Sequence, residues 1–308
     1  MKAYMTVYNE FKRNIFEFLN TNIYIIGVFL FVILALYSSS SIEPYYYKYL
    51  NNPLPIDYFY YMFSSQFFTA GGYLIMLIIS AIPISEDLES MKFDIAKTSG
   101  LKKGWIVVGK YLWLLLYSFI VMFLSICIYS VIIFNKYIQF NTTYITDILP
   151  LLGVYMLLMV LIIMQGMLFS SIFSKRISAV LASLSSYFVL IFSSSLIVNQ
   201  YLSSTSVYQP HMNKMGYLIV SSQFPFWLRV LYSLGSGFQN FVPVVLNFFS
   251  INEPNDECIP TNSSAPSFND PLLMYGHTYM YFLIYGIFIV ALMTTTFIVL
   301  KYRNRVIN

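Results

Sequence analysis

The stretch ISEDLESMKFDIAKTSGLKKGWIVVGKYL, residues 84–112, holds nine charged residues, although the whole chain of 308 residues has only 17 Lys and Arg and 13 Asp and Glu. It lies between two long stretches that contain no charged side chain at all. We refer to residues 84–112 as the charged segment. Its position between apolar stretches indicates a connection between two membrane-spanning helices.

The composition predicts an all-α polytopic membrane protein. Hydrophobic residues make up 58% of the chain, the mean hydropathy is +0.68, and only 10% of the residues are charged. Soluble domains have roughly 25% charged residues. Cys127 lies in an apolar run and Cys258 in a polar one, so we expect neither a disulfide nor a metal site from them.

Runs of about 20 predominantly apolar residues predict membrane-spanning helices. Six such runs occur, at residues 22–42, 60–84, 111–134, 149–173, 178–198 and 278–300. The stretch 224–249 is also apolar, but Pro225 and Pro243 interrupt it and Arg229 lies within it. We therefore expect broken or re-entrant helices there, within a long extracellular segment at 199–277.

The distribution of basic residues predicts the orientation, because cytoplasmic loops are enriched in Lys and Arg. Six spans place residues 1–21, the charged segment, the Lys175–Arg176 turn and the tail at 301–308 on one side, and these hold 13 of the 17 basic residues. Both termini are therefore expected in the cytoplasm, with the chain in the cell membrane. The glycosylation sequons at Asn141 and Asn262 then face outward.

Residues 1–21 predict an amphipathic helix on the inner leaflet. Apolar residues recur at helical spacing, at Tyr4, Tyr8, Phe11, Ile15 and Phe18. Lys12, Arg13 and Glu17 lie off that stripe. A signal peptide and a disordered tail are the alternative interpretations.

The chain offers few residues for chemistry. The six predicted spans contain no Asp, Glu, Lys or Arg, which argues against an ion-coupled transporter, although backbone carbonyls could still hold Na⁺. His211 and His277 have no catalytic partner at a recognisable spacing. We expect no enzymatic activity, no metal and no bound cofactor in this chain.

Gly104–Tyr111, GWIVVGKY, nearly matches the phosphate-loop pattern. Tyr111 replaces the hydroxyl residue that would hold Mg²⁺, and no buried strand precedes it. We therefore expect any ATP to be bound by another chain.

Within the charged segment, the sequence predicts a short amphipathic helix at residues 85–99. Ser85 is suited to cap its start, Glu86 and Asp87 favour the positive end of the helix dipole, and Gly100 can end it. Leu88, Met91 and Ile95 share one face. A surface helix with apolar and charged contacts of this kind is suited to dock onto a partner.

The charged segment resembles the region between the second and third spans in membrane subunits of type-2 ATP-binding cassette (ABC) exporters. The pattern is carried by SEDLES, TSGLKK and IVVGK, at positions Glu86, Asp87, Glu89, Gly100, Lys102, Lys103, Ile106, Gly109 and Lys110. Ser90 and Met91 stand where the family commonly has Gly-Thr.

The resemblance implies that the helix at 85–99 is a coupling helix, seated on a nucleotide-binding subunit. Its expected contact residues are Glu86, Asp87, Leu88, Glu89, Met91 and Ile95. Lys102, Lys103 and Lys110 are expected to anchor the following turn to lipid headgroups.

The same resemblance implies a pair of permease subunits, identical or related, with two cytosolic ATPase subunits that bind ATP and Mg²⁺. The charge-free spans favour an amphiphilic cargo, such as a lipid, a hydrophobic peptide or a drug-like molecule. We expect no nucleic-acid partner. A membrane assembly or anchoring protein, an ion-coupled transporter and an embedded enzyme are the alternatives.

Overall fold

The computed structural model describes residues 2–20, 22–40, 63, 67, 71–93, 103–136, 143–204 and 278–306. Every regular element in these ranges is a helix, as the composition predicted. The eight helices are α1 (Lys2–Asn20), α2 (Asn22–Ser40), α5 (Tyr73–Ala81), α6 (Pro83–Glu89), α8 (Lys103–Lys136), α9 (Thr143–Ile172), α10 (Arg176–Ser204) and α14 (Thr278–Val306).

Three stretches in this part of the chain are long and apolar enough to cross a membrane: Asn22–Ser40, Gly104–Lys136 and Tyr155–Ile172. Two shorter apolar helical stretches, Arg176–Val189 and Gly286–Tyr302, overlap in part with the fifth and sixth predicted spans. Of the second predicted span, the structure describes residues 71–84 and two isolated phenylalanines. These helices indicate a membrane protein.

Several helices extend beyond the predicted spans. α8 begins at Lys103, before the span expected from 111, and α14 continues to Val306, through most of the tail. α10 runs to Ser204, six residues beyond the end of the fifth predicted span at 198. Hydropathy detects the apolar middle of a helix, whereas backbone hydrogen bonding continues into the polar ends. The stretch 224–249 and both sequons lie outside the described residues.

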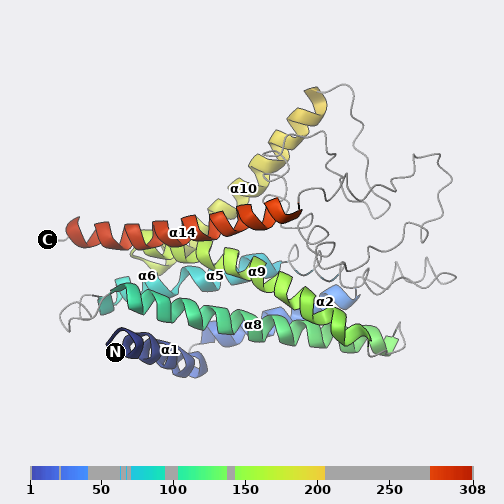
Figure 1. The fold of residues 1–308 in the computed structure, drawn as a ribbon, viewed down its shortest axis with the longest axis horizontal. Helices are drawn as coiled ribbons and strands as arrows, with labels where there is room; N and C mark the ends of the chain where they lie inside the picture. Colours follow the sequence, from blue (N-terminus) through green and yellow to red (C-terminus); the bar gives the residue numbers. More distant parts are fainter. Residues whose placement is uncertain are drawn as a thin grey trace.

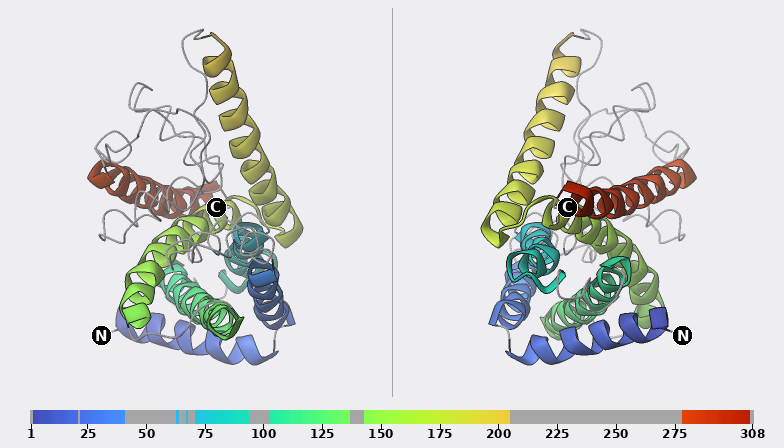
Figure 2. Two further views of the ribbon diagram at one scale, coloured as in Figure 1. Left: turned by 90° about the vertical axis from the view of Figure 1, so that its right-hand side faces the viewer. Right: turned by 90° about the vertical axis from the view of Figure 1, so that its left-hand side faces the viewer.

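The long helices form an antiparallel bundle (Figure 1). α8 runs along the length of the molecule, and α1 lies across it near the left-hand end, where the chain also ends. α9 lies between α8 and α14, and Figure 2 shows α10 diverging from the rest of the bundle.

The apolar core of the bundle lies between α2, α5, α8 and α9. Its largest members are aromatic: the Phe63 ring centroid is 4.7 Å from that of Tyr129 and 4.9 Å from that of Phe67. Aromatic pairs at these distances add to the packing energy. A polar connection crosses the same region, because the Tyr73 hydroxyl donates to Gln165 Oε1 and Gln165 Nε2 donates to Ser186 Oγ at 2.9 Å.

α5 and α9 pack closely against each other at Gly166. A methyl group built on Gly166 would overlap the Ser80 hydroxyl and lie 2.9 Å from the Leu77 carbonyl oxygen. Small residues at helix interfaces allow backbones to pack closely in membranes. Gly166 therefore sets the spacing between these two helices.

Gly166→Ala should destabilise the chain by about 1–3 kcal/mol, because the added methyl group forces α5 away from α9. Thermal unfolding of the purified chain in mild detergent, followed by circular dichroism, measures the change. Gly153→Ala is the matched control on the same helix, since nothing lies within 4 Å of the added carbon. Equal unfolding midpoints for the two variants would contradict the close approach.

Candidate functional site

The start of α6 is capped by another helix. Ser170 Oγ of α9 accepts hydrogen bonds from the Ile84 N–H at 3.0 Å and from the Ser85 N–H at 2.8 Å. The Ser85 hydroxyl instead donates to the Ala81 and Ile82 carbonyls. The prediction that Ser85 caps the helix was wrong, because Pro83 already occupies the first helical position and Ser85 lies inside the first turn.

α6 is shorter than the helix predicted at 85–99. It ends at Glu89, where the Ser90 N–H donates to the Glu86 carbonyl at 2.9 Å. Met91 follows with φ of 56°, a left-handed conformation that a helix cannot contain. Lys92 and Phe93 are helical again, and residues 94–99, including Ile95, lie outside the described part.

Asp87 faces the bundle interior and is 2% exposed. Lys110 Nζ of α8 lies 2.9 Å from Asp87 Oδ2 and donates to the Pro83 carbonyl at 2.8 Å. Lys110 itself is 3% exposed. The prediction that Lys110 anchors the chain to lipid headgroups was wrong, since its ammonium group is enclosed between α6 and α8.

Glu10 and Arg13 of α1 join this pair. Glu10 Oε1 lies 4.0 Å from Lys110 Nζ, and Arg13 lies 2.5 Å from Glu10 Oε1 and 3.6 Å from Asp87 Oδ2. Lys92 Nζ lies 3.7 Å from Asp87 Oδ1. We call these five residues the ionic junction. It holds α1, α6 and α8 together with two carboxylates and three cations.

Gly109 makes room for the junction. A side chain there would meet Glu10 Cβ at 2.8 Å and the Val7 carbonyl oxygen at 3.1 Å. α1 can therefore lie directly on α8, which places Glu10 beside Lys110. Gly109 thus allows the close approach of α1 to α8, and the next residue, Lys110, carries the buried charge.

The opposite side of α6 faces outward and contacts α10. Arg176 Nε lies 3.1 Å from Glu89 Oε2, and Arg176 Nη1 lies 3.6 Å from Glu86 Oε1. The hydrogen bonds from the Arg176 backbone and side chain to Glu89 lower the pKa of that carboxyl group. All three side chains are well exposed, so these pairs contribute little to stability.

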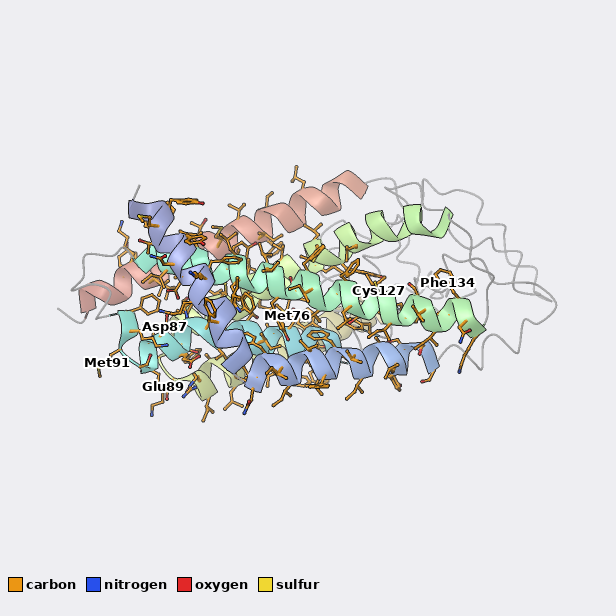
Figure 3. All side chains as sticks on the ribbon, turned by 90° about the horizontal axis from the view of Figure 1, so that it is seen from below. Met76, Asp87, Glu89, Met91, Cys127 and Phe134 are labelled. Atoms are coloured by element: carbon orange, nitrogen blue, oxygen red, sulfur yellow. The ribbon has the colours of Figure 1, made fainter. Side chains whose placement is uncertain are left out.

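The apolar row predicted on this helix is divided by the turn after Glu89. Leu88 is half-buried and packs against the core, whereas Met91 is 68% exposed. Figure 3 shows Asp87, Glu89 and Met91 at one end of the molecule, far from Phe134. Of the predicted contact residues, Glu86, Glu89 and Met91 are thus accessible, and Asp87 is not.

The other predicted site residues are only partly described. Lys103 begins α8, and Lys102, Asn141 and Asn262 lie outside the described residues. Gly104–Tyr111 is part of α8 and does not form a phosphate loop. Among the residues with described positions, no group of three or more His, Cys, Asp or Glu side chains could hold a metal ion.

The sequence interpretation missed the roles of Glu10 and Ser170. One signal for the junction was available, because Lys110 has apolar residues on both sides, in IVVG before it and YLWLLL after it. A lysine inside an apolar helix needs a carboxylate partner. Nothing in the sequence marks Ser170, one serine among many, as a cap for α6.

The chain matches no protein-family model and none of the curated proteins with which it was compared. Its function must therefore be argued from its residues and their geometry.

Lys110→Met should destabilise the chain by about 3–5 kcal/mol, because it leaves the Asp87 and Glu10 carboxylates buried without their central cation. Lys92→Met is the matched control: Lys92 is partly exposed, and its removal should cost at most about 1 kcal/mol. Adding Asp87→Asn to Lys110→Met should recover part of the loss. Thermal unfolding in detergent measures all three, and similar midpoints for Lys110→Met and Lys92→Met would contradict a buried junction.

Proposed function

We propose that this chain is the permease subunit of a type-2 ABC exporter in the cell membrane. Two permease subunits, identical or related, enclose the path for an amphiphilic cargo such as a lipid, a hydrophobic peptide or a drug-like molecule. Two cytosolic ATPase subunits bind ATP and Mg²⁺ and supply the energy. The resemblance of the charged segment to this family supports the proposal.

The proposed arrangement has six membrane spans with both termini in the cytoplasm. The three span-length helical stretches and the two shorter apolar ones support it, as does the position of both termini at the same end in Figure 1. The starts of α8 and α10, whose first residues are Lys103 and Arg176, lie toward that end (Figure 1), in agreement with the positive-inside rule.

α1 is proposed to lie on the inner leaflet. Among its residues with described side chains, the buried ones are the polar Glu10 and Asn14, whereas Tyr4, Tyr8 and Phe16 are exposed. A helix that turns its polar side to the protein and its aromatic side outward is suited to lipid rather than water. Of the apolar stripe predicted from the sequence, Tyr4, Tyr8 and Ile15 are exposed, as this orientation requires, and Phe11 packs against the core. The side chain of Phe18 lies outside the described part of the chain.

The ionic junction is the observation that carries the coupling proposal. α6 presents Glu89 and Met91 to the exterior, while Asp87 on its inner side is tied to α1 and α8 through Lys110. A force applied to the exposed side of α6 is therefore passed to a membrane-spanning helix. This is the property that a coupling helix requires.

Met91→Asn should weaken ATPase capture by about 2 kcal/mol, roughly thirtyfold in affinity, because truncating an interface anchor has an effect of this size. Asn tolerates the left-handed conformation of residue 91, so the turn itself should persist. The measurement is co-purification of a cytosolic ABC ATPase subunit from the cells that express this chain, together with cargo-stimulated ATP hydrolysis after reconstitution.

Ser174→Asn is the control for Met91→Asn, because Ser174 is also exposed in the turn between α9 and α10. The Ser174→Asn variant should bind the ATPase subunit as well as the wild type does. Equal binding of the ATPase subunit by both variants would show that Met91 does not contribute to the interface. A complex that forms but shows no cargo-stimulated hydrolysis would instead indicate an assembly or anchoring role.

Cysteines placed at Asn141 and Asn262 should react with an impermeant maleimide in intact cells, because the six-span topology puts both residues outside. The background variant replaces Cys127 and Cys258 by Ser. A cysteine at Met91 is the control, and it should react only after lysis. Protection of either outer position until lysis would overturn the six-span topology.

A further inference from the structure

The connection between α5 and α6 interrupts a helix without turning the chain away from it. α5 ends at Ala81 and α6 begins at Pro83, and Ile82 between them keeps helical dihedral angles, with φ of −89° and ψ of −45°. The helical backbone hydrogen bond is present again at Glu86, whose N–H donates to the Ile82 carbonyl at 2.9 Å. We call residues 82–85 the helix break.

Side chains take over the hydrogen bonding at the helix break. Pro83 has no N–H group. The next two N–H groups, those of Ile84 and Ser85, donate to Ser170 Oγ of α9 at 3.0 and 2.8 Å. The Ser85 hydroxyl donates to the Ala81 carbonyl at 3.0 Å, which is the carbonyl that the Ser85 N–H pairs with in a regular helix. The connection therefore depends on a hydroxyl group from another helix.

α9 holds the two sides of the helix break in different ways. On the α5 side, Gly166 of α9 packs closely against Ser80 and the Leu77 carbonyl, so this side is fixed. Ser170 lies about one turn further along α9 and is 0% exposed. On the α6 side, the orientation of the helix depends on whether Ser170 accepts the two N–H groups.

The same two N–H groups have a second pair of acceptors nearby in the chain. In a more regular helix the Ile84 N–H pairs with the Ser80 carbonyl, and the Ser85 N–H pairs with the Ala81 carbonyl. Exchange of one hydrogen bond for another changes the free energy little, so two orientations of α6 are close in free energy. Pro83 opposes the regular form, because its ring clashes with the carbonyl four residues earlier.

The contacts of α6 allow it to pivot at the helix break. Ile84 is fully buried, but it lies at the pivot and so moves little. Further along, Leu88 is half-buried and Met91 is exposed. Asp87 is buried against Lys110, whose flexible four-carbon side chain can follow a change in the position of the carboxylate.

We propose that the helix break is a hinge with two hydrogen-bonded states, and that Ser170 holds α6 in the orientation seen here. In the other state the N–H groups of Ile84 and Ser85 return to the backbone carbonyls of α5, and the far end of α6 moves relative to α9. The hinge requires only α5, α6 and α9. Its use in coupling rests on the proposed function, so the hinge and the coupling are tested separately.

Paired spin labels measure the orientation of α6. Cysteines at Met91 and Gly153 carry the labels, because Met91 lies beyond the hinge and Gly153 is an exposed position of α9 with room for a side chain. Cys127 and Cys258 are replaced by Ser, and the full chain is purified in mild detergent. With no further change, double electron–electron resonance should give one principal distance between the labels.

Ser170→Ala should add a second distance, because it removes the acceptor of two N–H groups and shifts them toward the backbone carbonyls of α5. Pro83→Ala should add that same second distance, since it removes the ring that opposes the regular helix. Ser125→Ala is the matched control. Ser125 is also 0% exposed, but its hydroxyl donates to the Val121 carbonyl of its own helix at 2.8 Å, and the variant should keep the original distance.

A common second distance in variants of two different helices supports the hinge, because local damage to the fold would not produce it. The original distance alone in both Ser170→Ala and Pro83→Ala would overturn the hinge. Two different new distances, a broad distribution or a new distance in only one folded variant would overturn it too. If one variant does not fold, the presence or absence of a second distance in the other decides.

Cargo-stimulated ATP hydrolysis tests the use of the hinge. In the reconstituted complex, Ser170→Ala should bind the ATPase subunit as the wild type does and lose the stimulation by cargo. Unchanged stimulation in a variant that shows the second distance would exclude a role of the hinge in coupling. Failure of the wild type to bind any ATPase subunit would contradict the proposed function, whereas the label distances alone decide the hinge.

Discussion

The contact between Lys110 and Asp87 is the constraint on which this end of the molecule depends. Both side chains are almost completely buried, and the ammonium nitrogen lies 2.9 Å from the carboxylate oxygen. A buried charge without a partner is costly, so neither residue can be enclosed unless the other is. Lys110 also binds the Pro83 carbonyl at the start of α6. The position of α6 relative to α8 follows from these two bonds.

The junction also explains why α1 belongs to the bundle. Apolar contacts alone give helices in lipid little reason to associate, because lipid tails are equally apolar. Glu10 adds a second carboxylate beside Lys110, and Gly109 allows α1 to approach closely enough for this contact. Charge and close packing thus act at adjacent positions of α8. Electrostatic attraction is directional here in a way that hydrophobic burial cannot be.

Hydropathy and periodicity predicted the helical class and the approximate position of α2, α8 and α9. They could not predict the junction, because a sequence pattern does not show which distant side chains will meet. The expectation that Lys110 binds headgroups treated it as the edge of a span, but α8 begins seven residues earlier, at Lys103. The helix at 85–99 was predicted from local signals, namely its end residues and the spacing of its apolar row, and the left-handed Met91 interrupts that spacing after α6.

The two sides of α6 are held by interactions of different strength. On the inner side Asp87 is enclosed and paired, whereas on the outer side Glu86 and Glu89 meet Arg176 in contact with water. Exposed ion pairs are weak enough to exchange partners, and buried pairs are not. The outer ion pairs of α6 can therefore break without disturbing Asp87. α6 can change its outer contacts while its connection to α1 and α8 persists.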